Sequence, residues 1–184
     1  MYTTKRYTAS ISIDEYLENY VDIPTFLECC KACPNYNQIW SCPTYDFDVE
    51  SYWKQYHTFD LIGVQMIFDE ESRLKEYTAE ELNKVIKASI LPEKQKLTDE
   101  LFKKEKEVPN SISLSAGSCI MCGKGNCTKP EGKPCRHPEK MRYSIESLGG
   151  NVGKTIHDLF HVDLEWMEEG KLPTYFVLVC GLLS

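Results

Sequence analysis

The chain lacks several features that would assign it to a large protein class. Residues 1–6 lead into a polar stretch and show no apolar signal segment. The only long apolar run, Tyr175 to Leu183, is too short to span a bilayer. Basic residues are in deficit, with 21 Lys and Arg against 28 Asp and Glu and a formal net charge of -7. We therefore expect a cytoplasmic protein without a membrane span and without general affinity for nucleic acid.

Familiar catalytic and repeat motifs are missing as well. The sequence contains no internal repeat and no G-x-S-x-G motif. The stretch from Gly149 to Thr155 approximates a phosphate loop, but Leu148 stands where the G-x4-G-K-[ST] frame needs its first glycine. The sequence therefore names no reaction, and whether the chain is an enzyme stays open.

Cysteine, by contrast, is abundant. The chain has nine cysteines, and eight of them lie in two segments, residues 29–43 and 118–142. Without a secretion signal, clustered thiols more often bind metal or carry out redox chemistry than form a disulfide framework. The ninth, Cys180, falls in the final apolar run and is expected in the core.

The second segment holds a complete set of four metal ligands. Cys119, Cys122, Cys127 and Cys135 occur within seventeen residues that are rich in glycine and proline. Because this stretch has almost no apolar side chains to bury, packing alone cannot fix its shape, and we expect a metal bonded to the sulfurs to do so. The spacing C-x2-C-x4-C-x7-C matches neither ferredoxin run, and only its beginning resembles a zinc knuckle.

The first segment offers further thiols. Cys30 and Cys33 form a C-x2-C pair, and Cys42 follows after eight intervening residues. Cys29 and Cys30 cannot easily point the same way; Cys30 has the better spacing, and Cys29 remains an alternative ligand. This segment is expected to form a second metal site or to complete one metal-binding lobe together with the second segment. A buried free thiol is the competing interpretation, above all for Cys29.

Thiolate ligands alone do not distinguish an iron–sulfur cluster from zinc. Four thiolates around iron leave a negatively charged site, which nearby cations and backbone N–H groups stabilise. The basic residues of the second segment are Lys124, Lys129, Lys133, Arg136, Lys140 and Arg142, against Glu131 and Glu139. We therefore predict an iron–sulfur cluster of the 4Fe-4S type on the four cysteines of this segment, with zinc as the alternative.

Strands and helices are predicted to alternate along the chain. The predicted strands are residues 7–13, 59–68, 112–116 and 174–182, with 59–68 central because it is almost wholly apolar. The predicted helices lie near residues 14–20, from 22 to the first cysteines, from 78 onward, over 138–148 and near 155–160.

Two details qualify the helix that begins at Thr78. Pro92 is expected either to kink it or to start a second helix. The charged stretch 93–107 is expected to be a solvated face without chemistry. Together these elements predict one α/β or α+β domain over residues 1–184, a small sheet with flanking helices and a cysteine-rich metal-binding lobe.

The two cysteine motifs together resemble a known family. The first is Cys-x2-Cys-Pro-x-Tyr-x3-Trp-Ser-Cys-Pro, from Cys30 to Pro43. The second runs from Ser118 to Gly149 and comprises Ser-Cys-x2-Cys, Pro-Cys-Arg-His-Pro-Glu-Lys-Met-Arg and Ser-x-Glu-x-x-Gly. They resemble a prokaryotic domain-of-unknown-function family described as predicted metal-binding proteins, over nearly the whole chain. This chain has Thr44 where such proteins commonly show a second proline.

The resemblance implies metal binding and no established reaction. The ligands that it implies are Cys30, Cys33, Cys42, Cys119, Cys122, Cys127 and Cys135. The expected role is electron transfer or redox support for a partner protein. The alternatives are a zinc-stabilised interaction module and a metal-dependent enzyme; the sequence does not predict the oligomeric state.

Overall fold

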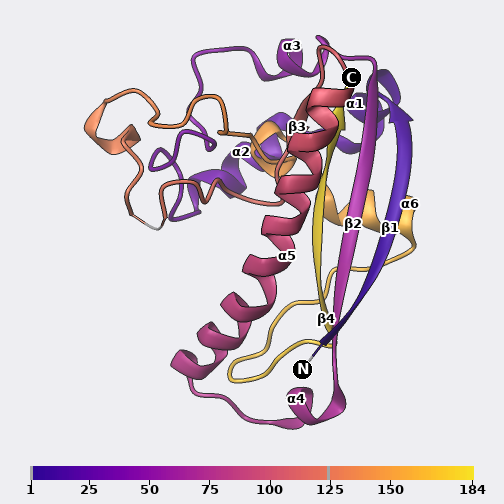
Figure 1. The fold of residues 1–184 in the computed structure, drawn as a ribbon, viewed down its shortest axis with the longest axis vertical. Helices are drawn as coiled ribbons and strands as arrows, with labels where there is room; N and C mark the ends of the chain where they lie inside the picture. The colour runs from indigo at the N-terminus through magenta and orange to yellow at the C-terminus, as the bar shows by residue number, and fades with distance from the viewer. Residues whose placement is uncertain (1, 124) are drawn as a thin grey trace.

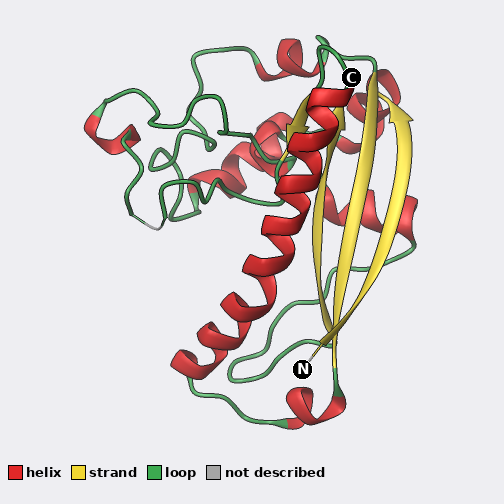
Figure 2. Cartoon of the chain, in the orientation of Figure 1, coloured by secondary structure: helices red, strands yellow, loops and turns green. Residues whose placement is uncertain are grey.

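The computed structural model describes residues 2–123 and 125–184. It shows an α+β fold, in which helices pack on both faces of a four-stranded antiparallel sheet of order β1-β2-β4-β3 (Figure 1). The strands are β1 (Tyr2–Ser12), β2 (Thr58–Phe68), β3 (Ile112–Leu114) and β4 (Tyr175–Leu183). A loop-rich region, formed by residues 29–43 and 118–142 and called the cysteine lobe below, projects from one side of the sheet (Figure 2).

Strand β2 is central, as its sequence predicts. It pairs with β1 along its whole length, from Thr58 opposite Ser12 to Phe68 opposite Tyr2, and with β4 on its other side. Alternate residues point to opposite faces of a strand. Almost every residue of β2 is buried, because helices cover both faces of the sheet.

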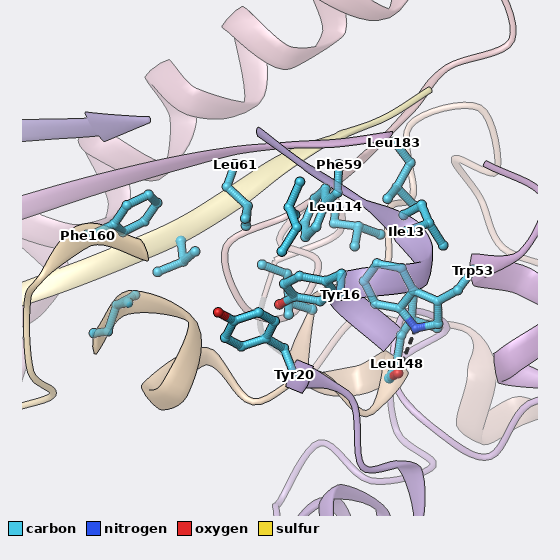
Figure 3. Packing of buried hydrophobic residues seen from close by; sticks show 14 of the residues in the cluster. Ile13, Tyr16, Tyr20, Trp53, Phe59, Leu61, Leu114, Leu148, Phe160 and Leu183 are labelled. Carbon is cyan, nitrogen blue, oxygen red and sulfur yellow. Dashed lines mark hydrogen bonds between the residues drawn. The ribbon is translucent and has the colours of Figure 1, made fainter. Parts of the chain in front are cut away.

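One face of the sheet carries the larger core. It is covered by α1 (Ile13–Tyr20), α3 (Val49–Trp53), the 3-10 helix η2 (Glu146–Leu148) and α6 (Val152–Phe160). The Trp53 indole donates a hydrogen bond to the Leu148 carbonyl at 2.9 Å (Figure 3). The Tyr16 hydroxyl lies 2.9 Å from that of Thr155. These bonds satisfy polar groups that would be costly to bury unpaired.

Helix α5 (Ala79–Glu107) covers the opposite face. Its Leu97 and Leu101 pack in a second cluster with β2 and with Cys180, which is fully buried, as predicted. The helix begins with the predicted capping box of Thr78 and Glu81. Pro92 lies inside one continuous helix, so the alternative of a second helix is wrong. A proline removes one intrahelical hydrogen bond, and the packed turns on the C-terminal side maintain the helix.

The remaining helices are short. Helix α2 (Ile23–Lys31) begins where predicted, with the Asp22 carboxylate accepting a hydrogen bond from the Thr25 N–H at 3.1 Å and Pro24 in the first turn. Helix α4 (Glu70–Leu74) and the 3-10 helix η1 (Lys129–Glu131) were not predicted, and neither was α3. None of the described helices is both long and apolar enough to cross a membrane.

The helix predicted over residues 138–148 is wrong. Only η2 is helical there, and Ser144 forms a parallel bridge with Ser115. The Ser115 N–H donates to the Tyr143 carbonyl at 2.7 Å, which holds this stretch extended. The hydroxyls of Ser144 and Ser147 also accept hydrogen bonds from each other's backbone N–H. Such local bonds compete with helix formation.

Candidate metal centre

The cysteine lobe has little apolar material of its own. Helix α2 carries Cys29 and Cys30 in its last turn, and the second segment follows β3. Among the described residues of the two segments, only Ser41, Pro43 and Thr128 are buried. A lobe with no large buried apolar side chain needs another source of stability, and small cysteine-rich regions obtain it from metal or disulfides.

Hydrogen bonds tie the two segments of the lobe to each other. The Cys119 N–H donates to the Ser41 hydroxyl at 3.0 Å, and the Asn35 side-chain amide donates to the Ser118 hydroxyl at 3.3 Å. The Trp40 indole donates to the Lys133 carbonyl at 3.2 Å. These bonds bring segments about 80 residues apart into one unit.

One lysine strengthens this connection. The Lys129 ammonium donates to the carbonyls of Cys42, at 2.5 Å, and Thr44, at 2.9 Å. It also lies over the rings of Trp40 and Tyr45, 5.6 and 5.7 Å from their centroids. A cation of the second segment is therefore held by the backbone and aromatic side chains that surround Cys42 in the first.

The thiols fall into two adjacent groups. In the first, burial raises the pKa of Cys30 to about 11, and the charges of Cys42, Cys33 and Cys29 act in the same direction. In the second, burial raises the pKa of Cys119, and so do the charges of Cys135 and Cys122.

Cys42 joins the two groups. Burial is the largest cause of its raised pKa. The charges of Cys33 and Cys119, one from each segment, raise the pKa further. Cys127 is connected to the first group through Lys129, whose ammonium interacts with both Cys127 and Cys42. The structure thus brings the predicted ligands of both segments into one electrostatically connected region.

All of the nine cysteines are free thiols. Cys29 and Cys33 are exposed, and the other six cysteines of the lobe are half-buried. The described residues include no group of three or more His, Cys, Asp or Glu side chains already arranged to hold a metal ion. Among the described residues, the thiols are therefore coupled electrostatically without forming a coordination shell. Their chemistry still fits a soft, thiolate-binding metal.

Backbone amides point at two of the sulfurs. The Asn35 N–H donates to the Cys33 sulfur at 3.5 Å, and the Met121 backbone hydrogen bond stabilises the Cys119 thiolate. In both cases the donor follows the cysteine by two residues. Hydrogen bonds of this kind orient metal-bound thiolates and tune the metal.

Aromatic side chains separate the lobe from the core. The Tyr45 ring stacks on Phe47 at 4.8 Å and meets Tyr143 edge-on at 5.0 Å, and Tyr52 meets Tyr143 at 5.4 Å between ring centroids. The Tyr45 hydroxyl donates to the Ser41 carbonyl at 2.9 Å. This aromatic wall packs against the larger core and contacts the first cysteine segment. Sequence reasoning missed it, although Tyr45 and Phe47 closely follow Cys42.

The interpretation of residues 93–107 as a solvated face is wrong for part of the stretch. Glu93 and Lys94 are buried, and the Lys94 ammonium donates to the Ser118 carbonyl, next to Cys119. Lys94 shares one helix face with Leu97 and Leu101, at i, i+3 and i+7, which was the available signal. The long side chain reaches from that buried face toward the lobe.

A buried carboxyl group lies near the same place. Burial raises the pKa of Glu146, against the effects of hydrogen bonds and of the Lys94 charge. Its Oε2 atom is buried without a hydrogen-bond partner among the described residues. The Glu146 charge also contributes to the raised pKa of Cys30. Lys94 and Glu146 thus bring two ionisable groups to the inner side of the lobe.

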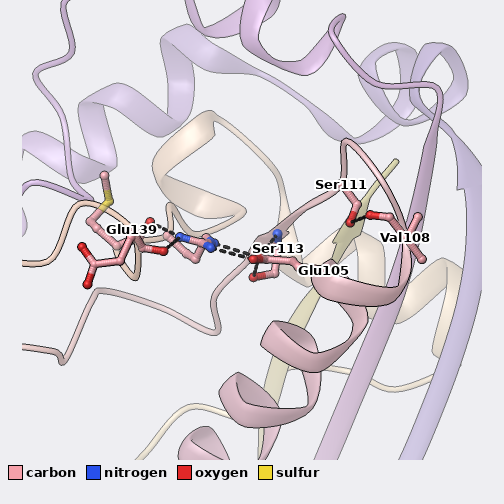
Figure 4. Close-up of polar contacts among 7 residues, drawn as sticks. Glu105, Val108, Ser111, Ser113 and Glu139 are labelled. Atoms are coloured by element: carbon pink, nitrogen blue, oxygen red, sulfur yellow. Dashed lines mark hydrogen bonds and ion pairs between the residues drawn. The ribbon is translucent and has the colours of Figure 1, made fainter.

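Two other basic residues of the second segment form ion pairs with carboxylates. The Arg142 guanidinium binds both carboxylate oxygens of Glu105, at 2.8 and 2.6 Å. The same carboxylate accepts from the N–H and hydroxyl of Ser113 (Figure 4). Lys133 pairs with Glu131 at 2.7 Å on the surface. Lys124 lies outside the described residues.

Of the two cavities found in the described part of the chain, neither has room for a substrate beside a thiol. An open groove of about 800 Å³ lies between α1 and the start of α2, and no cysteine lines it. A second cavity, of about 20 Å³, adjoins Lys94 and Cys119. A space of this size holds about one water molecule.

Comparison with known families supports the metal-binding interpretation. A family model described as a predicted metal-binding protein matches residues 19–181. The match includes both cysteine segments and most of the sheet. The comparisons with curated proteins and with solved structures gave no match. Since the family model covers most of the chain, the protein belongs to the family of predicted metal-binding proteins called DUF2284.

Proposed function

We propose that the cysteine lobe binds an iron–sulfur cluster on Cys119, Cys122, Cys127 and Cys135 and serves electron transfer or redox support of a partner protein in the cytoplasm. The observation that carries the proposal is the hydrogen bond from the Cys119 N–H to Ser41. It connects the two groups of free thiols in a lobe without an apolar core. The first segment would hold a second metal site or complete the lobe.

Several residues would support such a cluster, which supplies one-electron redox chemistry when bound. The amides of Asn35 and Met121 donate to cysteine sulfurs. Lys129 offers positive charge beside Cys42 and Cys127. The aromatic wall would shield a cluster on the side where Tyr45 contacts Ser41, and solvent access helps to set a cluster's potential.

A structural zinc site is the second candidate. The scarcity of buried side chains in the lobe favours it, because structural zinc replaces a hydrophobic core in small cysteine-rich modules. Zinc would crosslink the two segments and make the lobe an interaction module without redox chemistry.

Metal and sulfide analysis of anaerobically purified protein separates the two candidates. An iron–sulfur protein is expected to be brown, to contain iron and acid-labile sulfide in similar amounts, and to be bleached by dithionite. Colourless protein with stoichiometric zinc would support the second candidate. Folded protein that takes up neither metal would contradict both.

Two cysteine variants localise the site. Cys122→Ser is expected to lose most of the bound metal, because Cys122 belongs to the proposed ligand set. The matched control is Cys180→Ala, since Cys180 is buried against β2 with its thiol directed at the Ile62 carbonyl. The control is expected to keep its metal; equal metal content in both variants would contradict the assignment to the second segment.

A further inference from the structure

We propose that Lys94 is a positioning residue of the metal centre. Its buried ammonium joins helix α5 to the second cysteine segment at Ser118 and supplies a fixed positive charge beside the backbone that leads into Cys119. The inference rests on the proposed function, because this charge matters to the thiols when they hold a metal as thiolates.

The geometry places the ammonium against the backbone that leads into the second segment. Lys94 is 7% exposed, and its Nζ atom donates to the carbonyl of Ser118, the residue before Cys119. A Cβ atom built on Gly117 would lie 3.9 Å from the same Nζ. The ammonium therefore lies close to the turn at residues 117–118 and restrains the position from which Cys119 starts.

The charge of Lys94 needs anions nearby. An ammonium has three donors, and a buried one is unfavourable unless acceptors or negative charges surround it. Burial lowers the pKa of Lys94, and the charges of Cys119, Glu146 and Cys42 oppose that effect. Metal binding converts thiols to thiolates, so a loaded centre adds negative charge close to the Lys94 ammonium.

The adjoining cavity argues against a different role. It is lined by Lys94, Cys119 and Ser115 among others, and its volume of about 20 Å³ admits about one water molecule. Lys94 thus acts on the centre and not on a bound substrate. Residues that position the ligands of a metal site change metal affinity by about 10–100-fold when they are replaced.

Cobalt(II) titration of the reduced, metal-free full chain tests the inference, since cobalt–thiolate absorption reports both affinity and the number of bound sulfurs. Lys94→Met removes the charge and keeps the length of the side chain. Lys94→Gln removes the charge and keeps a hydrogen-bond donor for the Ser118 carbonyl. Both are expected to bind cobalt about 10–100-fold more weakly. Lys94→Arg keeps the charge and is expected to retain most of the affinity. Lys87→Met, exposed on the same helix, is the control and should match the wild type.

The reduction potential gives a second measurement on iron–sulfur-reconstituted protein. Removing a positive charge makes an added electron less favourable, so both charge-free variants should shift the potential to more negative values, and Lys94→Arg should restore it. A merely structural lysine would leave the potential unchanged.

The outcomes separate this inference from the proposed function. Two results would overturn the role of Lys94 alone. One is a wild-type cobalt affinity and reduction potential in a charge-free variant that folds. The other is a loss of cobalt affinity in Lys94→Arg as large as in Lys94→Met. A wild-type chain that binds neither cobalt nor a cluster would overturn the proposed function, and the inference with it.

Discussion

The backbone N–H of Cys119 donates a hydrogen bond to the hydroxyl of Ser41, 3.0 Å away, although the two residues are 78 positions apart in the chain. Ser41 is fully buried and directly precedes Cys42. This bond joins the backbone of one proposed ligand to the residue before Cys42, and it is one of several hydrogen bonds that hold the two segments of the lobe together. Four predictions test this bond and the contacts that hold the lobe to the rest of the fold.

Ser41→Ala should loosen the lobe. The substitution leaves the Cys119 N–H without its acceptor, and an unsatisfied buried donor costs about 1–3 kcal/mol. We expect a lower free energy of unfolding by urea and weaker metal binding. Ser10→Ala, at an exposed position of β1, is the control and should change both quantities little. Unchanged metal affinity in Ser41→Ala would show that the segments do not depend on this bond.

Gly149→Ala should displace helix α2 and with it Cys29 and Cys30. Gly149 has φ +82°, and a Cβ atom there would lie 2.8 Å from the Cα atom of Ile23. Strain and overlap together should lower the free energy of unfolding by about 3 kcal/mol or more. Gly132→Ala has a similar positive φ with nothing within 4 Å, and should cost only about 1–2 kcal/mol. Equal losses in urea unfolding would rule out the overlap with α2.

The Glu105–Arg142 pair should make stability depend on acid pH. Burial alone would raise the pKa of Glu105, but hydrogen bonds from Arg142 and Ser113 outweigh it and lower the pKa below 4.5. A lowered folded-state pKa contributes stability above the unfolded value and loses it as the pH falls through the folded one. Glu105→Gln should therefore cost about 2–3 kcal/mol at pH 7, and this difference should shrink below pH 4.5.

Urea unfolding across the pH range from 3 to 7 measures this difference. Glu107→Gln is the matched control on the same helix, because its carboxylate is 60% exposed and lies 3.9 Å from Lys103. An exposed pair of this kind contributes less than about 1 kcal/mol. A stability difference for Glu105→Gln that stays constant across the range would argue against the lowered pKa.

Metal removal should release the lobe and spare the sheet. Chelation under reducing conditions is expected to speed amide hydrogen exchange in residues 29–43 and 118–142 by roughly tenfold or more, because little buried apolar surface holds them. Amides of β2 and β4 should keep their protection, since they lie in the two packed cores. Equal exchange before and after chelation would mean that the lobe holds its shape without metal.

Local patterns predicted the elements whose causes are local. The apolar run of β2, the Asp22–Pro24 start of α2 and the Thr78 capping box each depend on residues close in sequence, and each was predicted. The helix over 138–148 failed because the pairing of Ser115 with Tyr143 and Ser144 depends on a distant segment. Local sequence propensity carries no information about a pairing partner that is distant in the sequence.

The candidate site shows the same division. The spacing of the cysteines identified two thiol-rich segments, but the Ser41–Cys119 bond that joins them connects residues 78 positions apart in the chain. The role of Lys94 was hidden by its charged neighbours, and only its helical spacing from Leu97 indicated burial. The ligand set and the metal remain predictions, because thiol spacing alone suits more than one metal.

The position of Trp40 makes the protein's fluorescence depend on what the lobe binds. The three tryptophans occupy different surroundings: Trp53 is fully buried, Trp166 is 84% exposed, and Trp40 lies inside the lobe with its indole bonded to the Lys133 carbonyl. A coloured centre formed in the lobe would accept excitation energy from Trp40 and dim its fluorescence, whereas a colourless ion would not. Iodide in the solvent would quench the exposed Trp166 most strongly and the buried Trp53 least, so the emission that changes on metal addition can be compared with that of Trp166.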